Sequence, residues 1–139
     1  MLKMLIVPPF GLSTHSRRVS VGLLLLRLVV GFAFMAHGFA KIQNPMAWMG
    51  PEAPVPGLFQ ALAALAEFGG GLAWILGLLT PLASLGILST MAVAVLTHMG
   101  RGDGFTGGYE LALVFLSVAV LLLLAGPGKY SADAKIAGK

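Results

Sequence analysis

Four long apolar stretches, separated by helix-breaking residues, dominate the chain. A helix that crosses a membrane needs about 20 mainly apolar residues. Four segments reach or approach this length: residues 20–42, 58–79, 82–99 and 109–125. Pro45, Pro81 and the glycines between positions 100 and 108 interrupt the apolar pattern, as expected between helices. The pattern predicts an all-α membrane protein, a four-transmembrane-helix bundle.

Composition supports lipid as the surrounding solvent. Of the 139 residues, 58% are hydrophobic and 10% are charged, and the mean hydropathy is +0.92. Soluble domains average roughly 45–50% apolar and about 25% charged residues. We expect an N-terminal tail (1–19), a bundle (20–126) and a C-terminal tail (127–139). The absence of cysteine excludes disulfides and cysteine-held iron–sulfur clusters. Because no basic stripe lies on a soluble surface, nucleic acid is not an expected partner.

The distribution of lysine and arginine predicts the orientation of the bundle. Cytoplasmic ends of membrane helices carry an excess of these residues. With four spans, both tails lie on one side, which carries Lys3, Arg17, Arg18, Lys129, Lys135 and Lys139. The opposite side carries only Lys41 and Arg101. We therefore expect both tails to lie in the cytoplasm (N-in/C-in).

Six ionisable residues within or at the ends of these spans are the candidate functional residues. They are Arg27, His37, Lys41, Glu67, His98 and Glu110. A charge at the centre of a bilayer costs at least about 2.5–3.5 kcal/mol, so such residues usually face the bundle interior and find partners. At 100° per residue, those of the first span fall within roughly a 100° arc, which must face the other helices.

Depth along the helices predicts two polar layers. Arg27 and Glu67 differ by about 6 Å in depth, so we expect them to pair. His37, Lys41, His98 and Glu110 lie nearer the outer ends, where Lys41 and Glu110 are expected to pair. The two layers either line one cavity for a ligand or a proton path, or form a structural network that fixes helix register. Haem ligation by the two histidines is a minor alternative, and no metal site is expected, because paired Glu-x-x-His motifs are absent.

Several motifs around these residues carry a family resemblance. They are Arg27-Leu-x-x-Gly31, His37-Gly38-x-x-Lys41, Glu67-Phe-Gly-Gly-Gly-Leu72, Gly77-Leu-Leu-Thr-Pro81, His98 before a glycine-rich loop, Tyr109-Glu110-Leu and Gly126-Pro-Gly-Lys-Tyr-Ser-Ala-Asp133. In this order and spacing, from about residue 20 to 133, they resemble the DoxX family of small membrane proteins. The resemblance implies a four-helix, multi-pass protein of a bacterial or archaeal cell membrane. It also implies a link to quinone-dependent redox chemistry, because relatives act as membrane subunits of thiosulfate:quinone oxidoreductase.

Three functions remain open at this point. The first is a membrane subunit of a quinone-linked oxidoreductase, in which the polar cavity binds a quinone head group or moves protons. Other membrane or peripheral redox subunits would then supply the electrons, because the chain has no evident redox centre. The second is a noncatalytic assembly or anchor subunit, and the third is a transporter of protons or small solutes. Whether the chain is itself an enzyme stays open. A second copy of the chain is a further candidate partner, beside the lipid bilayer.

Overall fold

The computed structural model describes residues 15–138, and this part of the chain contains helices but no strands. The elements are α2 (Arg17–Gln43), α3 (Gly57–Leu76), α4 (Thr80–Gly100), the short irregular turn η1 (Phe105–Tyr109), α5 (Glu110–Ala125) and α6 (Ala132–Ile136). Four helical segments are long and apolar enough to span a membrane: α2, α3, α4 and the continuous stretch of η1 and α5. The predicted four-transmembrane-helix bundle is confirmed.

The turn between α3 and α4 shows why the second predicted span ends too late. We expected that span to continue to residue 79, but α3 ends at Leu76. Gly77 has a left-handed backbone (φ +63°), and its N–H bonds to carbonyls of the last turn of α3. Pro81 then lies in the first turn of α4, where its missing N–H costs nothing. Glycine therefore ends one helix and proline begins the next.

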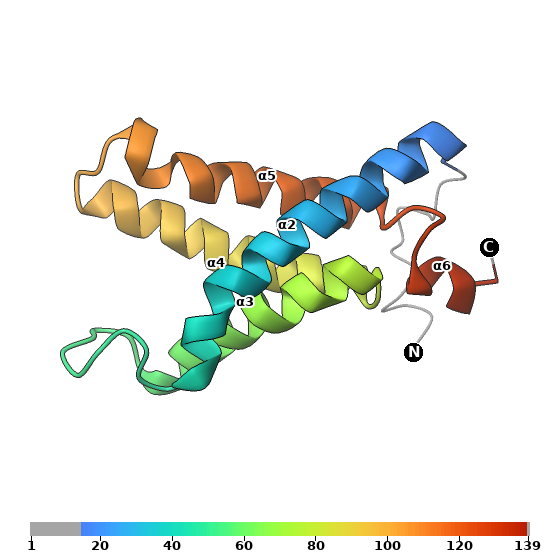
Figure 1. Cartoon of the computed structure of the whole chain (residues 1–139). Coiled ribbons are helices and arrows are strands. Elements are labelled where there is room, and N and C mark those ends of the chain that lie inside the picture. Colours follow the sequence, from blue (N-terminus) through green and yellow to red (C-terminus); the bar gives the residue numbers. More distant parts are fainter. Residues whose placement is uncertain (1–14, 139) are drawn as a thin grey trace.

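The helices form two antiparallel pairs that diverge toward one end (Figure 1). α2 packs mainly against α3, α4 packs mainly against α5, and α3 joins the pairs through its contact with α4. We call the end with residues 44–56 and 101–109 the loop end, and the end with residues 77–79 and 126–138 the tail end. In Figure 1 the two pairs are far apart at the loop end and close together near the tail end.

The core of the bundle combines small residues with a few large ones. The buried apolar residues of the core are Leu23, Val30, Phe34, Trp74, Ile87, Met91, Ala112, Ala119 and Leu122. The indole N–H of Trp74 donates to the Ser84 hydroxyl at 3.0 Å, so its polar atom is satisfied across the contact between α3 and α4. Many large apolar side chains on the outer faces are exposed, as expected of helices surrounded by lipid.

α2 and α3 approach each other so closely that glycine is required on both helices. A Cβ atom added at Gly31 would lie 2.7 Å from the carbonyl oxygen of Gly71, and one added at Gly71 would lie 2.6 Å from the carbonyl oxygen of Gly31. Near the loop end, a Cβ atom at Gly38 would lie 2.6 Å from the backbone nitrogen of Phe68. Close backbone approach is the main source of attraction between helices in lipid. These glycines therefore fix the first helix pair.

The C-terminal segment packs against the tail end of the bundle. Its residue Asp133 is fully buried. The Asp133 carboxylate accepts hydrogen bonds from the backbone N–H groups of Leu79 (2.8 Å) and Thr80 (2.9 Å), and the Asp133 N–H donates to the Gly77 carbonyl at 2.9 Å. Leu79 has a left-handed backbone and offers α4 no side-chain cap. Asp133 thus caps α4 from a distant part of the chain.

The orientation of this bundle in the membrane stays a prediction, and reporter fusions test it. We expect fusions after Lys139 and within the turn at Thr80 to report the cytoplasm, and a fusion at Glu52 to report the opposite side. The reason is the excess of lysine and arginine at the tail end. A matched pair of reporters, one active only in the cytoplasm and one only outside, provides the control. A cytoplasmic signal at Glu52 would reverse the proposed orientation.

Candidate functional site

Four of the six candidate residues line one pocket at the loop end, between the two helix pairs. His37 and Lys41 come from α2, Glu67 from α3 and His98 from α4. The remaining lining residues are Phe34, Met91, Ala94, Gly108, Leu111, Ala112 and Phe115. We call this recess of about 190 Å³ the loop-end pocket. It combines four ionisable groups with an apolar and aromatic floor.

A bidentate ion pair joins α2 to α3 in this pocket. The Lys41 ammonium lies 2.6 Å and 2.7 Å from the two carboxylate oxygens of Glu67. The Lys41 side chain is 24% exposed and that of Glu67 only 6%, so the carboxylate depends on the lysine for its partner. The contact at Gly38 explains the pair, because it brings α2 against Phe68, the residue after Glu67. The predicted Lys41–Glu110 pair is wrong, since Lys41 binds Glu67 instead.

The 44–56 loop folds over this ion pair and is held by Gln60. The Trp48 ring lies 4.5 Å from the Lys41 ammonium, in cation–π geometry, and its indole N–H donates to the Gln60 carbonyl at 2.9 Å. The buried Gln60 amide accepts from the Met49 N–H (3.0 Å) and donates to the Val55 carbonyl (2.8 Å). Sequence reasoning missed Gln60, although it is the one polar residue besides Glu67 in α3.

The two histidines have different environments within the loop-end pocket. The His37 ring lies 6.3 Å from the Phe115 ring, in an edge-to-face arrangement. The Nδ1 atom of His98 lies 2.7 Å from a carboxylate oxygen of Asp103, in the connection that follows α4. Asp103 lies in the glycine-rich loop and was not predicted as a site residue. The backbone around Gly102, which has a φ of +79°, brings it back to His98.

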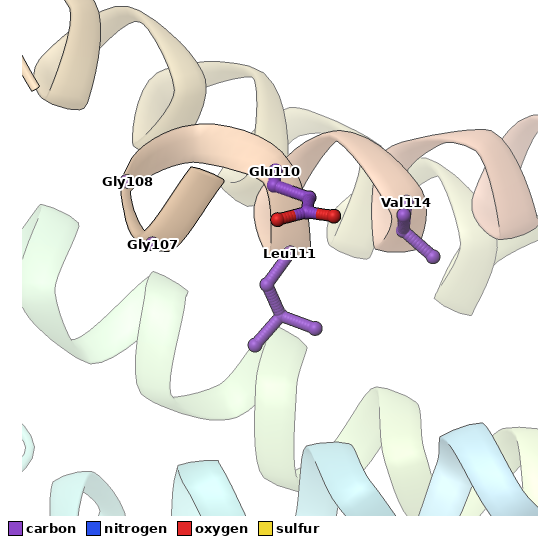
Figure 2. Close-up of a pocket in the computed structure, with 5 residues that line it drawn as sticks. All are labelled: Gly107, Gly108, Glu110, Leu111 and Val114. Atoms are coloured by element: carbon purple, nitrogen blue, oxygen red, sulfur yellow. The ribbon is translucent and has the colours of Figure 1, made fainter. Parts of the chain in front are cut away.

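Glu110 lies outside the loop-end pocket. Figure 2 shows Glu110 with Leu111 and Val114 on the first turns of α5, after Gly107 and Gly108, and its side chain leaves the helix in a different direction from that of Leu111. These residues line a neighbouring open recess of about 380 Å³. Gly108 and Leu111 line both recesses, but Glu110 lines only the second. Of the four residues expected in the outer layer, His37, Lys41 and His98 share the loop-end pocket and Glu110 does not. Glu67 is the fourth ionisable residue of that pocket.

Arg27 lies at the tail end and is fully buried. Its Nη2 donates to the Tyr130 carbonyl at 2.6 Å, Asp133 acts on it electrostatically, and its guanidinium packs directly against Gly77. Its Nε and Nη1 atoms have no hydrogen-bond partner among the described residues. The predicted Arg27–Glu67 pair is wrong, because the C-terminal segment returns to the bundle and takes Arg27, while Lys41 takes Glu67.

Comparison with known proteins agrees with this helical architecture. The DoxX family model matches residues 22–100. Inner membrane protein YqjF of Escherichia coli is 36% identical over 121 residues, which cover 81% of this chain and 90% of that protein. An uncharacterized protein of Haemophilus influenzae is 32% identical over 119 residues, covering 81% and 89% of the two chains. Uncharacterized membrane protein Rv3486 of Mycobacterium tuberculosis is 30% identical over 129 residues, covering 80% and 78%.

No solved structure matches the chain significantly. The family match nevertheless covers more than half of the sequence, and the relatives are similar over most of their own length. The Escherichia coli and Mycobacterium tuberculosis relatives are named as membrane proteins, in agreement with the four apolar spans found here. The chain is therefore a multi-pass membrane protein that belongs to the DoxX family.

Proposed function

We propose that the protein is an integral membrane subunit of a quinone-linked oxidoreductase system, and that the loop-end pocket receives the quinone head group. The observation that carries the proposal is the content of this pocket. An ion pair and two histidines meet there above an aromatic floor, in a recess between two diverging helix pairs. Ionisable residues at membrane depth are functional candidates by default, because their burial is costly.

The side chains of the pocket match the chemistry of a quinone ring. Its two carbonyl oxygens accept hydrogen bonds, which the Lys41 ammonium and a histidine N–H can donate. Its flat ring suits the Phe34 and Phe115 rings, which lie 4.7 Å apart and tilted to each other. Pockets for drug-sized ligands measure about 300–1,000 Å³, so a recess of about 190 Å³ suits a single ring whose tail stays in lipid.

The ion pair gives the pocket a neutral but polar character. Lys41 can turn part of its donor capacity from Glu67 to a ligand oxygen, while Trp48 keeps the ammonium in place. Glu67 stays an acceptor beside it, so the total charge does not change when a neutral ligand enters. When bound, the quinone would supply the two-electron redox chemistry. A partner subunit would supply the electrons.

Quinone binding tests the proposal directly. Purification in mild detergent followed by mass spectrometry of extracted lipids should find quinone with the protein. Added decylubiquinone should quench tryptophan fluorescence saturably, because Trp48 contacts Lys41. We expect the double variant Lys41→Met/Glu67→Gln to bind it about 10–100-fold more weakly, the loss of one charged hydrogen bond. The double variant avoids leaving Glu67 buried without its partner.

Arg101→Met is the matched control for this titration. It also removes a positive charge at the loop end, but Arg101 is exposed and does not line the loop-end pocket. Its affinity for decylubiquinone should equal that of the wild type. If the wild type contains no quinone and shows no saturable binding, the proposal is wrong. Stoichiometric partner chains without quinone would instead favour a noncatalytic anchor subunit.

A further inference from the structure

We infer that the loop-end pocket recognises the reduced, hydroxyl-bearing form of its ligand, a quinol, through His98, and that Asp103 is the residue that positions His98 for this role. The inference rests on the proposed function and goes further, because it distinguishes two redox forms of the same ligand. It also assigns a role to Asp103, which lies outside the pocket lining.

The turn after α4 fixes Asp103 beside His98 through backbone and side chain together. The Asp103 N–H donates to the His98 carbonyl at 3.0 Å, while the Asp103 carboxylate lies 2.7 Å from His98 Nδ1. Gly102 permits this return with its left-handed backbone. On the other side, a Cβ atom added at Gly108 would lie 3.0 Å from the Asp103 Cβ atom. Asp103 is thus held between the end of α4 and the start of the last span.

This contact determines which nitrogen of His98 carries the proton. An ionised carboxylate only accepts hydrogen bonds, so the Nδ1 atom of His98 must donate. In a neutral imidazole, the remaining nitrogen, Nε2, is then an acceptor. His98 also lines the loop-end pocket, and Nε2 is the ring nitrogen left for a ligand there. A quinol hydroxyl donates a hydrogen bond to such an acceptor, whereas a quinone carbonyl cannot.

Of the two histidines in the pocket, only His98 has a carboxylate partner that fixes its tautomer, among the residues that the structure describes. Across the pocket, α2 contributes Lys41 and His37, and α3 contributes Glu67, whose carboxylate already binds Lys41. From the last span, the neighbouring pocket residues Leu111 and Ala112 are apolar. Arg101, on the same turn as His98, is exposed. The side chains of His98 and Asp103 are 37% and 39% exposed, so this pair also lies close to water at the loop end.

Separate titrations of the two redox forms test the inference. We expect Asp103→Asn to weaken the binding of decylubiquinol about 10-fold and to change the binding of decylubiquinone much less, because the amide can donate to Nδ1 and leave Nε2 protonated. Glu52→Gln is the matched control, because it neutralises an exposed carboxylate of the other loop at the same end. It should leave both affinities unchanged.

Nitrogen NMR of histidine-labelled protein gives a second readout that does not depend on ligand. The His98 signals of the neutral ring in the wild type should show the Nδ1–H tautomer, and Asp103→Asn and Asp103→Ala should shift them toward the Nε2–H tautomer. If the His98 tautomer is the same in the Asp103 variants and the wild type, or if Asp103→Asn loses equal affinity for quinol and quinone, Asp103 does not have the inferred role. The proposed function would stay in place. If the wild type binds neither form, the proposed function itself fails.

Discussion

Replacing Gly71 with alanine should separate α2 from α3 and greatly reduce the amount of folded protein. The added methyl group would lie 2.6 Å from the Gly31 carbonyl oxygen and 2.9 Å from the Met35 nitrogen. Both are backbone atoms, which cannot move aside as a flexible side chain can. Overpacking costs about 1–3 kcal/mol where side chains can adjust, so we expect a loss at or above the upper end of this range. Thermal unfolding in detergent, followed by circular dichroism, measures it.

Gly22→Ala provides the control for this substitution within the same helix pair. Gly22 lies in α2, and a Cβ atom there meets nothing within 4 Å. Alanine also has the higher helix propensity, so this variant should unfold at the wild-type temperature or slightly above it. Gly31→Ala should reproduce the loss, because it places a methyl group 2.7 Å from the Gly71 carbonyl oxygen. A stable Gly71→Ala protein would show that the two helices can separate without loss of the fold.

Replacing Asp133 with alanine should destabilise the tail end by about 2–6 kcal/mol, because it leaves two backbone N–H groups without their acceptor, each at a cost of about 1–3 kcal/mol. The variant removes the acceptors of two backbone N–H groups at the start of α4, and it removes the negative charge that acts on the buried Arg27. Loss of a helix cap alone costs about 0.5–2 kcal/mol. Hydrogen exchange at the N–H groups of Leu79 and Thr80 would locate the effect, and thermal unfolding would measure its size.

Two further substitutions separate the charge of Asp133 from its hydrogen bonds. Asp133→Asn keeps one acceptor oxygen and loses the charge, so its stability should lie between those of the wild type and Asp133→Ala. Lys135→Ala changes an exposed residue of the same short helix, α6, and should leave unfolding unaffected. Equal exchange rates at Leu79 and Thr80 in all of these proteins would contradict the capping role. From most to least stable, the expected order is wild type and Lys135→Ala, then Asp133→Asn, then Asp133→Ala.

The positions of the spans and the inward face of α2 could be predicted from local patterns. Apolar length determined the four spans, and the arc of polar residues on the first span correctly predicted that Arg27 and Lys41 face other parts of the protein. Their partners could not be predicted in this way. Depth placed Arg27 within reach of Glu67, but the return of residues 126–138 to the bundle depends on contacts between segments far apart in the sequence.

The remainder of the site depends on loops whose conformation has no simple sequence pattern. Trp48 follows the end of the first span, where an interfacial aromatic residue is common. Its position over Lys41 depends on the hydrogen bonds that Gln60 makes to the 44–56 loop. Asp103 reaches His98 only because Gly102 turns the chain back. Polar residues inside apolar spans, such as Gln60, are the signal that would have improved the prediction. Such residues indicate a site as strongly as charged residues in the same spans do.

The capping of α4 by Asp133 has a consequence for biosynthesis. Asp133 follows Thr80 by 53 residues, so the ribosome makes the start of α4 well before it makes the cap. At synthesis rates of about 5–20 residues per second, this interval lasts roughly 3–10 seconds. During that time the N–H groups of Leu79 and Thr80 lack the Asp133 carboxylate, and Arg27 lacks the nearby negative charge. The tail end can therefore close only after the last span, Glu110–Ala125, has been translated.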